Sequence, residues 1–327
     1  MRVAVLDDYQ GVALEMADWS VLPRDTRVQV FRDHLASADA VAERLRGFDV
    51  VAAMRERTPF DRGLLGHLPD LRLLVTTAMA NASIDLDAAT EMGVLVCGTR
   101  GLGYPTAELT WGLVLALLRH IPQEDAATRQ GHWQTTVGIG LQGKVLGVMG
   151  LGRLGSQVAS IGAAFGMSVI AWSQNLTAER TAKFGVTLVA KDELFARSDI
   201  LSIHLRLSDR TTGLVGAREL GLMKPTAYLI NTSRGPIVDE AALIQALQAR
   251  AIAGAGLDVF DEEPLPPDHA FKRLDNTVLT PHLGYVTREG YEVFYGDTVE
   301  DIAAYLRGQP IRVLNPSVAQ RVRGRSR

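Results

Sequence analysis

The chain has 327 residues, 47% of them hydrophobic and 22% charged, with a formal net charge of −3. This length accommodates two globular domains, and the charge balance gives no sign of a nucleic-acid-binding surface; the basic end, 321–327, is interpreted as a solvated tail. The longest apolar run, 111–118, is far shorter than the roughly 20 residues that a membrane-spanning helix needs. Because Cys97 is the single cysteine, no internal disulfide can form, and we expect a cytoplasmic protein without nucleic-acid or membrane partners.

Strand-like and helix-like segments alternate through the first third of the chain. Five runs have the composition of buried strands: RVAVL, RVQVF, DVVAAM, LRLLVTTA and VLVCG. Stretches between them, such as ADAVAERLRGF, have the spacing of covering helices, and this alternation predicts a parallel sheet. After residue 104 the pattern changes to one long apolar helix, PTAELTWGLVLALLRHI, which Pro105 opens at a favoured first-turn position.

A second series of strand-like runs begins at Lys144. Its members are KVLGVMG, MSVIAW, VTLV, DILSIHL, AYLINTS, IAGAGLDVF and TVLT. Helical segments separate most of them, so a second parallel sheet is predicted, and EGYEVFYGDTVEDIAAYL after residue 287 predicts a last amphipathic helix. The expected fold class is therefore α/β, with two doubly wound parallel sheets.

The segment VMGLGRLGSQ at 148–157 has the spacing G-x-G-x-x-G between a strand and a helix. This context indicates a dinucleotide cradle, in which the pyrophosphate lies at the positive end of the helix. The glycines are Gly150, Gly152 and Gly155. The helix that follows carries Leu154, Val158, Ile161 and Phe165 at spacings that predict one face against the sheet.

The end of the next strand selects between NAD and NADP. An acidic residue there usually binds the adenosine ribose hydroxyls, but this chain has Ser173, which neither grips both hydroxyls strongly nor repels a 2′-phosphate. Arg180 and Arg206 could reach such a phosphate. We expect NAD, with NADP as the open alternative.

Three further segments follow predicted strands, at the edge where open α/β sheets bind ligands. They are NTSRGPIVDE with Arg234, LDVFDEEPLPP with Glu263, and TPHLG with His282. Together with GLGRLG, these motifs make the whole chain resemble the D-isomer-specific 2-hydroxyacid dehydrogenases, the family of D-3-phosphoglycerate dehydrogenase and hydroxypyruvate or glyoxylate reductases.

The resemblance implies a catalytic role for each of these three residues. Arg234 would bind the substrate carboxylate through its bidentate fork. His282 would give a proton to the carbonyl oxygen as hydride arrives, and take it back in the reverse reaction. An isolated histidine titrates near pH ~6.5, so Glu263 would favour the imidazolium and fix the ring.

The same resemblance implies further binding positions. Those for the dinucleotide are Gly150, Gly152, Arg153, Leu154, Gly155, Ser173, Thr232 and Asp258. Asp258 would accept a hydrogen bond from the nicotinamide carboxamide, Thr232 would line the nicotinamide, and the Arg153 amide would meet the pyrophosphate.

In the first domain, Arg55 of MRERT is implied in binding an extra substrate anion, and Met79 and Ala80 of TTAMANASID would offer backbone amides to the carboxylate. Departures from the family pattern are Ala78 and Ala80 in place of glycines, Arg206 in place of a proline, and Tyr285 in place of a glycine.

By resemblance, a Rossmann dinucleotide-binding domain at 100–286 is inserted into a flavodoxin-like substrate domain formed by 1–99 and 287–327. The apolar helix from Pro105 implies a homodimer, and the histidine spacing predicts no metal site. The expected function is an NAD(P)-dependent oxidoreductase for a small 2-ketoacid or D-2-hydroxyacid, its substrate left open. The alternative is a dinucleotide-sensing, corepressor-like binding protein; a formate-dehydrogenase-like activity is disfavoured, because that branch has glutamine where Glu263 stands.

Overall fold

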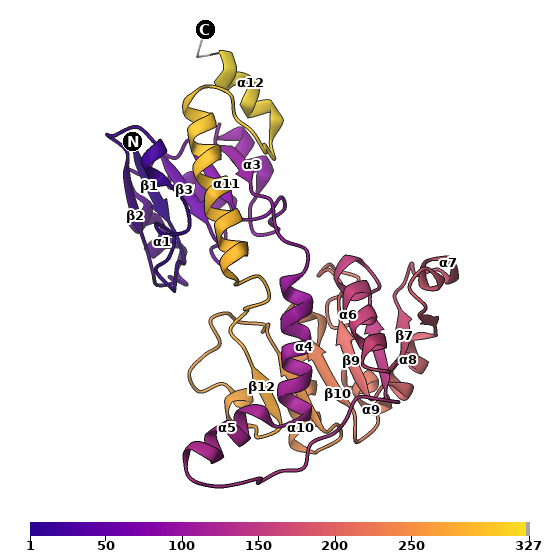
Figure 1. The fold of residues 1–327 in the computed structure, drawn as a ribbon. Coiled ribbons are helices and arrows are strands. Elements are labelled where there is room, and N and C mark those ends of the chain that lie inside the picture. The colour runs from indigo at the N-terminus through magenta and orange to yellow at the C-terminus, as the bar shows by residue number, and fades with distance from the viewer. Residues whose placement is uncertain (325–327) are drawn as a thin grey trace. The chain divides into compact units, whose positions relative to one another are not determined.

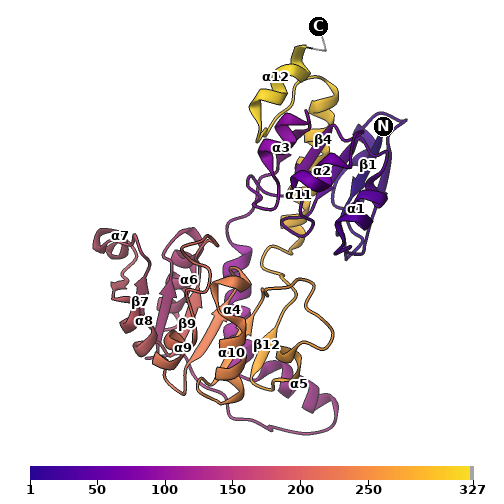
Figure 2. The ribbon, with the colours of Figure 1, turned by 180° about the vertical axis from the view of Figure 1, so that it is seen from behind.

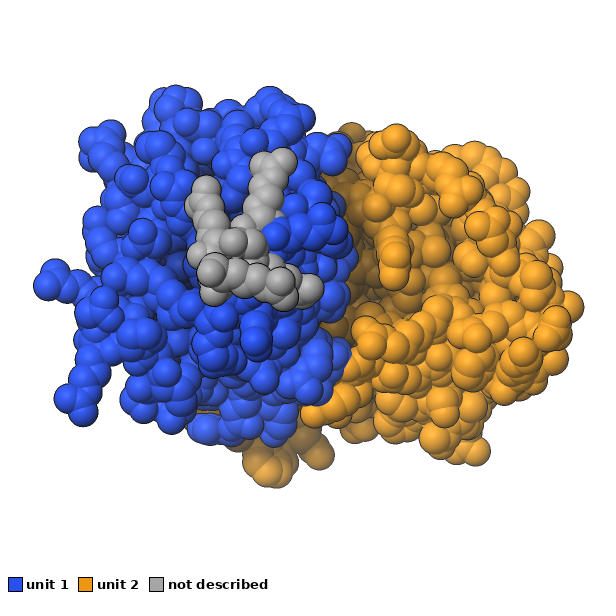
Figure 3. Space-filling model, turned by 90° about the horizontal axis from the view of Figure 1, so that it is seen from above, with its two compact units in different colours: residues 1–102, 287–327 blue, residues 103–286 orange. Residues whose placement is uncertain are grey.

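The computed structural model describes residues 1–324, and the side chains of the basic tail, 321–327, lie outside the described part. It contains two parallel sheets, each with helices on both faces (Figures 1 and 2). The chain divides into two compact units (Figure 3). Unit 1 comprises Met1–Leu102 and the segment from Thr287 onward, and unit 2 is Gly103–Val286, inserted between these two parts.

The sheet of unit 1 has the order β2-β1-β3-β4-β5, which is the flavodoxin-like arrangement. Its strands are β1 (Arg2–Val5), β2 (Arg27–Val30), β3 (Val50–Ala53), β4 (Leu73–Thr76) and β5 (Leu95–Gly98). One face is covered by α1 (Ala38–Leu45), α2 (Arg62–Gly66) and α3 (Leu86–Glu91). The other is covered by the 3-10 turn η1 (Trp19–Val21), α11 (Arg288–Leu306) and α12 (Pro316–Gly324). Strands β3, β4 and β5 are buried along their whole length, as a sheet covered on both faces requires, whereas the edge strand β2 alternates exposed and half-buried residues.

The sheet of unit 2 has the order β12-β11-β10-β9-β6-β7-β8, a Rossmann arrangement extended by one strand. Its strands are β6 (Val145–Met149), β7 (Ser168–Trp172), β8 (Thr187–Leu188), β9 (Ile200–Ile203), β10 (Tyr228–Asn231), β11 (Gly254–Leu257) and β12 (Thr277–Leu279). Helices α4 (Pro105–Leu118) and α6 (Arg153–Ala164) cover one face. The other face is covered by α8 (Lys191–Arg197), α9 (Ala217–Leu222) and α10 (Glu240–Gln248). The predicted fold class, two doubly wound parallel sheets, is confirmed.

The remaining elements of unit 2 are short. They are α5 (Ile121–Arg129), α7 (Ala178–Ala182), η2 (Gly235–Ile237) and η3 (Ala270–Arg273).

The helix that the sequence predicts over 105–121 is shorter in the structure. It ends at Leu118, and His120 lies in the left-handed region at φ 52° before α5 begins at Ile121. Pro122 explains the break, because a proline inside a helix would remove one hydrogen bond and collide with the carbonyl of residue 118.

The predicted buried face of α6 is also wrong in part. The structure buries Gly155, Val158, Ala159 and Gly162, whereas Phe165 is 40% exposed. The cause is close packing on the sheet: a Cβ on Gly155 would overlap the carbonyl oxygen of Gly150. Small residues therefore form the contact face, and Phe165 instead packs its ring 4.9 Å from that of Trp111.

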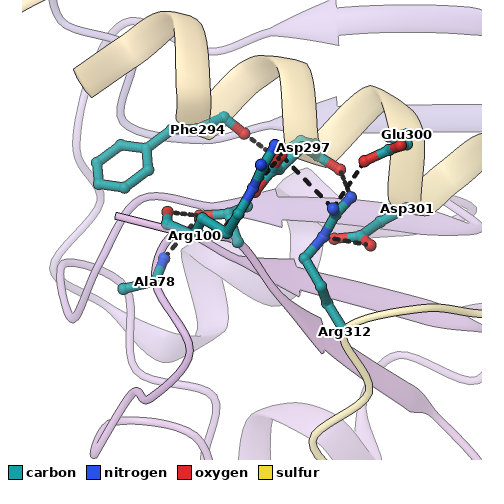
Figure 4. Close-up of polar contacts among 9 residues, drawn as sticks. Ala78, Arg100, Phe294, Asp297, Glu300, Asp301 and Arg312 are labelled. Atoms are coloured by element: carbon teal, nitrogen blue, oxygen red, sulfur yellow. Dashed lines mark hydrogen bonds and ion pairs between the residues drawn. The ribbon is translucent and has the colours of Figure 1, made fainter. Parts of the chain in front are cut away.

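Unit 1 contains a partly buried ionic network between α11 and the segment that follows it (Figure 4). The guanidinium of Arg312 donates to Asp301 at 3.0 Å and to Glu300 at 2.7 Å. The backbone of Arg312 is in the left-handed region, at φ 48°. Asp301 is fully buried, and among the described residues its Oδ2 accepts no hydrogen bond. Burial, opposed by Arg312 but reinforced by Asp297 and Glu300, raises the pKa of Asp301 to about 8.

Replacing Asp301 with asparagine tests this pKa through stability. When folding raises the pKa of an acid, the folded state becomes less stable as pH increases from the pKa of the unfolded chain to that of the folded chain. For Asp301 these two pKa values are near 4 and about 8. We therefore expect the thermal midpoint of Asp301→Asn minus that of wild type to increase by a few degrees between about pH 5 and pH 8. Above that range the difference should stay constant. Parallel midpoints across the range would mean that Asp301 is ionised throughout.

Candidate active site

Three neighbouring strands of unit 2 end at the same edge of the sheet. Strand β10 leads into Arg234, β11 into Asp258 and Glu263, and β12 into His282. Because β10, β11 and β12 are adjacent and parallel, the segments after them meet although they are distant in sequence.

His282 and Glu263 form a hydrogen-bonded pair in this cluster. His282 Nδ1 lies 2.6 Å from Glu263 Oε2, and the side chains are 17% and 30% exposed. The second carboxylate oxygen, Oε1, accepts the backbone N–H of Phe260 at 3.0 Å. The backbone of His282 is in the left-handed region at φ 55°, which is uncommon for residues other than glycine and tends to occur at functional sites. Because Nδ1 contacts Glu263, the other ring nitrogen of His282, Nε2, is not part of this pair.

The surroundings of Glu263 favour its carboxylate form. Burial alone would raise its pKa, but the hydrogen bond and charge of His282, the Phe260 N–H and the charge of Arg234 together hold the pKa below its usual value. An ionised Glu263 can accept a hydrogen bond from His282 Nδ1–H and so fix the orientation of the ring.

Arg234 is brought next to this pair by the glycine that follows it. A Cβ on Gly235 would overlap the carbonyl group of Phe260, so only glycine lets the Arg234 turn pack against the segment that carries Glu263. Asn231 Nδ2 donates to the Arg234 carbonyl at 2.9 Å, and Arg234 Nη1 donates to the Ser233 carbonyl at 2.8 Å. The structure therefore gathers the guanidinium, carboxylate and imidazole on one edge of unit 2.

Asp258 has contacts that the sequence did not predict. Its Oδ1 accepts from Thr280 Oγ1 at 2.6 Å and from the Leu283 N–H at 2.7 Å, while Oδ2 accepts from the Gly284 N–H at 2.9 Å. Asp258 is fully buried, and burial raises its pKa above the usual value although these hydrogen bonds and the charge of His282 oppose the rise. It thus holds the turn that carries His282.

Two threonines of α4 are site residues that sequence reasoning missed. Thr106 Oγ1 donates to the Gly284 carbonyl at 2.8 Å, and the hydroxyls of Thr110 and Thr232 lie 2.9 Å apart. The signal in the sequence is two hydroxyls four residues apart on a largely apolar helix, a spacing that places them on one face. Helix α4 therefore supports both the His282 turn and the predicted nicotinamide-side residue Thr232.

The glycine loop after β6 has the shape of a phosphate cradle. Gly150 has φ 101°, and a Cβ there would lie 2.7 Å from the His204 carbonyl oxygen. Gly152 is the N-cap residue of α6, and a Cβ on it would enter open space. The following residues, Arg153 and Leu154, are exposed and half-buried. Free amides at a helix start beneath open space fit a dinucleotide pyrophosphate.

The contrast between two glycines gives a test of the cradle. Because Gly152 has an ordinary negative φ and open space around it, Gly152→Ala should fold with an unchanged thermal midpoint but fill the space above the amides. We expect its Kd for NADH, measured by fluorescence, to rise at least about tenfold, equivalent to ~1.4 kcal/mol. Gly155→Ala should instead lower the thermal midpoint, because its Cβ would overlap the Gly150 carbonyl oxygen. Unchanged NADH affinity in Gly152→Ala would place the dinucleotide elsewhere.

The residues that the sequence predicts to choose between coenzymes lie after two strands: Ser173 and Arg180 follow β7, and Arg206 follows β9. Ser173 is half-buried and opens a turn in which its carbonyl accepts the Leu176 N–H at 3.1 Å. Arg180 stacks on the Phe184 ring, 5.0 Å from its centroid, and Arg206 is exposed. Within residues 1–324, neither arginine hydrogen-bonds to Ser173, so their part in phosphate binding stays a prediction. Tyr285, the other departure, lies edge-on to His282 with ring centroids 5.6 Å apart.

The predicted substrate-binding residues of unit 1 lie at the carboxyl end of its own sheet. Arg55 follows β3, with φ 53° and its N–H donating to Thr77 Oγ1 at 2.8 Å. Met79 and Ala80 follow β4 and are both exposed. Residues from neighbouring strands thus form one edge of unit 1, just as the Arg234 cluster does in unit 2.

Two features are absent from the described part of the chain. Across residues 1–324, no three His, Cys, Asp or Glu side chains are grouped so that they could bind a metal ion. None of the helices in that part combines the length and hydropathy that crossing a membrane would take.

The family profile described as "D-isomer specific 2-hydroxyacid dehydrogenase, NAD binding domain" matches residues 111–284. The chain belongs to the D-isomer-specific 2-hydroxyacid dehydrogenase family. It is 41% identical over 271 residues to a glyoxylate reductase of Aeropyrum pernix, covering 80% of this chain and 81% of that protein. The match therefore includes most of both chains.

Solved structures of dehydrogenases support the same assignment. A phosphoglycerate oxidoreductase from Vibrio cholerae superposes with a TM-score of 0.89 at 36% identity, over 94% of this chain and 99% of that one. The D-lactate dehydrogenase of Aquifex aeolicus, complexed with NAD and lactic acid, has a TM-score of 0.76 at 26% identity, over 94% and 96%. This 2-hydroxyacid dehydrogenase is accordingly an NAD-dependent oxidoreductase that acts on CH–OH groups.

Proposed function

We propose that the protein reduces a small 2-ketoacid to the D-2-hydroxyacid, and catalyses the reverse oxidation, with Arg234, Glu263 and His282 as its catalytic residues. The observation that supports this most directly is the 2.6 Å contact between His282 and Glu263, with the Arg234 turn packed against the Glu263 segment. The guanidinium, the carboxylate and the imidazole have complementary chemical tasks, and they lie on a sheet whose glycine loop fits a dinucleotide.

Each of the three side chains has a distinct role in the proposal. Arg234 binds the substrate carboxylate with its planar fork and orients the carbonyl group. His282 gives the proton on Nε2 to the carbonyl oxygen, so that the C=O bond becomes CH–OH. Glu263 accepts the hydrogen bond from Nδ1, which fixes the ring and stabilises its positive charge before the proton leaves. When bound, NADH supplies the hydride that reaches the carbonyl carbon.

The rest of the chain binds the two reactants. The amides after Gly150 and Gly152, with Arg153 and Leu154, would hold the pyrophosphate. Ser173 would meet the adenosine ribose, and Thr232 and Asp258 would meet the nicotinamide. NADP is the alternative coenzyme, since Ser173 carries no charge against a 2′-phosphate.

Unit 1 is proposed as the substrate domain. There Arg55 would bind an additional anionic group of the substrate, while the amides of Met79 and Ala80 would meet its carboxylate. The buried thiol of Cys97, whose pKa burial raises to about 12, is inert, which is in keeping with a cytoplasmic enzyme.

A homodimer is part of the proposal. The chain between α4 and β6 exposes large apolar side chains, with Trp133 79% and Val137 91% exposed. A contiguous patch of exposed apolar side chains is typical of an interface between chains. Sedimentation equilibrium should therefore give twice the mass of one chain.

The direct test of the proposed function is a panel of ketoacids with NADH and NADPH in parallel. We expect the absorbance of reduced nicotinamide to fall with at least one of glyoxylate, hydroxypyruvate and pyruvate. No change with any ketoacid and either coenzyme, in a protein that still binds NADH, would instead favour a dinucleotide-sensing protein.

A further inference from the structure

The loop formed by Thr77–Ala80 has an unfavourable backbone conformation. Ala78 has φ 80°, in the left-handed region that residues other than glycine rarely occupy. Thr77 is buried, whereas Met79 and Ala80 are exposed. Because free alanine would leave this conformation, neighbouring groups must hold it in place.

Thr99 is the side chain that holds this loop. Its hydroxyl oxygen accepts the Ala78 N–H at 2.8 Å, while the hydroxyl proton is donated to the Arg100 carbonyl at 2.9 Å. Thr99 is fully buried. Donation to Arg100 fixes the hydroxyl rotor, so that a lone pair of its oxygen faces the Ala78 N–H.

Gly98 brings the loop close enough for this contact. A Cβ on Gly98 would lie 2.7 Å from the Ala78 carbonyl oxygen and 3.1 Å from the Met79 Cα. The end of β5 therefore forms a floor on which the backbone of the loop lies directly.

Asp297 on α11 fixes the other end of this hydrogen-bond chain. Its Oδ2 accepts the Arg100 N–H at 2.7 Å, and its Oδ1 accepts from Arg100 Nη2 at 2.6 Å (Figure 4). Asp297 is buried, and burial would raise its pKa, but the hydrogen bonds of Arg100 and the charge of Arg312 lower it overall. The carboxylate therefore stays ionised and grips the backbone of Arg100.

We propose that Thr99, held through Arg100 by Asp297, is a positioning residue that sets the backbone amides of the Thr77–Ala80 loop for the substrate carboxylate. This inference rests on the proposed function, in which Met79 and Ala80 offer those amides. It assigns substrate affinity to a buried hydroxyl in unit 1 that does not itself touch the substrate.

The decisive variant is Thr99→Val, which keeps the shape of the side chain and removes its hydroxyl. We expect the KM for the ketoacid and the Ki of oxamate, a carboxylate analogue, to rise about five- to tenfold, as the loss of one buried hydrogen bond implies. The kcat and the Kd for NADH should change less than about twofold, because the dinucleotide cradle lies in unit 2.

Three companion variants separate positioning from simple destabilisation. Thr99→Ser retains the hydroxyl and should restore KM, and Asp297→Asn should raise KM in the same direction. The matched control is Thr90→Val: the Thr90 hydroxyl also donates to a carbonyl, that of Leu86 at 2.7 Å, and accepts from Asn315 at 3.1 Å, but it lies on α3. This variant should lower the thermal midpoint without changing KM.

The results of these variants distinguish a positioning role of Thr99 from a purely structural one. If Thr99→Val loses stability but keeps the wild-type KM and Ki, or if Thr90→Val raises KM equally, the positioning role is refuted while the proposed function stands. Should Thr99→Val fail to fold, a wild-type KM in Asp297→Asn would refute it equally. If wild type reduces no ketoacid, the proposed function fails and this inference falls with it.

Discussion

His282→Ala lowers kcat by about a thousandfold, because the carbonyl oxygen then receives no proton from a positioned acid. The Kd for NADH stays close to that of wild type, since the glycine cradle follows β6 and His282 follows β12 at the far edge of the sheet. Single-turnover kinetics and NADH fluorescence titration measure the two quantities separately.

The chain offers a matched control for this variant. His269 also pairs with a glutamate, its Nε2 lying 2.9 Å from Glu240 Oε1, and it is 17% exposed like His282. His269→Ala should therefore retain kcat within about a factor of two, since the His269 side chain contacts Glu240 and caps the Phe271 N–H and is not one of the proposed catalytic groups. An equal loss of NADH affinity and kcat in His282→Ala would show that His282 maintains the structure rather than the chemistry.

Arg234→Lys has the second largest expected effect. Lysine keeps the positive charge but loses the bidentate fork, so kcat/KM for the ketoacid should fall about a hundredfold or more, with NADH affinity unchanged. Arg234→Gln, which also removes the positive charge, should reduce kcat/KM for the ketoacid further. That variant also removes one of the groups that lower the pKa of Glu263, so the pKa of this carboxylate should rise.

Arg250→Lys is the control for the arginine substitutions. Arg250 makes an exposed ion pair with Asp275 at 2.5 Å, and such pairs contribute little to the free energy of unfolding. Its kcat/KM should equal that of wild type. If Arg234→Lys retains wild-type KM and kcat, another cation binds the substrate carboxylate, and the role proposed for Arg234 is wrong.

The sequence was sufficient to predict the sheets and the gathering of the three side chains. Strands of buried aliphatic residues are recognisable locally, and parallel strands place their carboxyl ends at one edge. That rule alone implies that the segments with Arg234, Glu263 and His282 meet. It does not give the 2.6 Å contact of Glu263 with His282, which depends on the turn between Phe260 and Glu263.

Other features depend on contacts that no local pattern reveals. Arg100 and Asp297 are 197 positions apart, and their hydrogen bonds exist only because α11 packs on the sheet of unit 1. Apolar spacing predicts that large side chains of α6 face the sheet. The structure instead places Gly155 and Gly162 there, because α6 packs too closely on β6 for larger residues. The hydrogen bonds that Asp258 accepts from Leu283 and Gly284 likewise follow from a turn that sequence spacing does not define.

The most direct test of the account follows a labelled hydrogen. The protein would be incubated with hydroxypyruvate or pyruvate and NADH deuterated at C4, each face labelled in a separate reaction, and the product resolved by chiral chromatography and mass spectrometry. The account predicts deuterium at C2 of the D-isomer from one labelled face, and none in the same time with His282→Ala. Formation of the L-isomer, or no transfer from either face while NADH still binds, would contradict it.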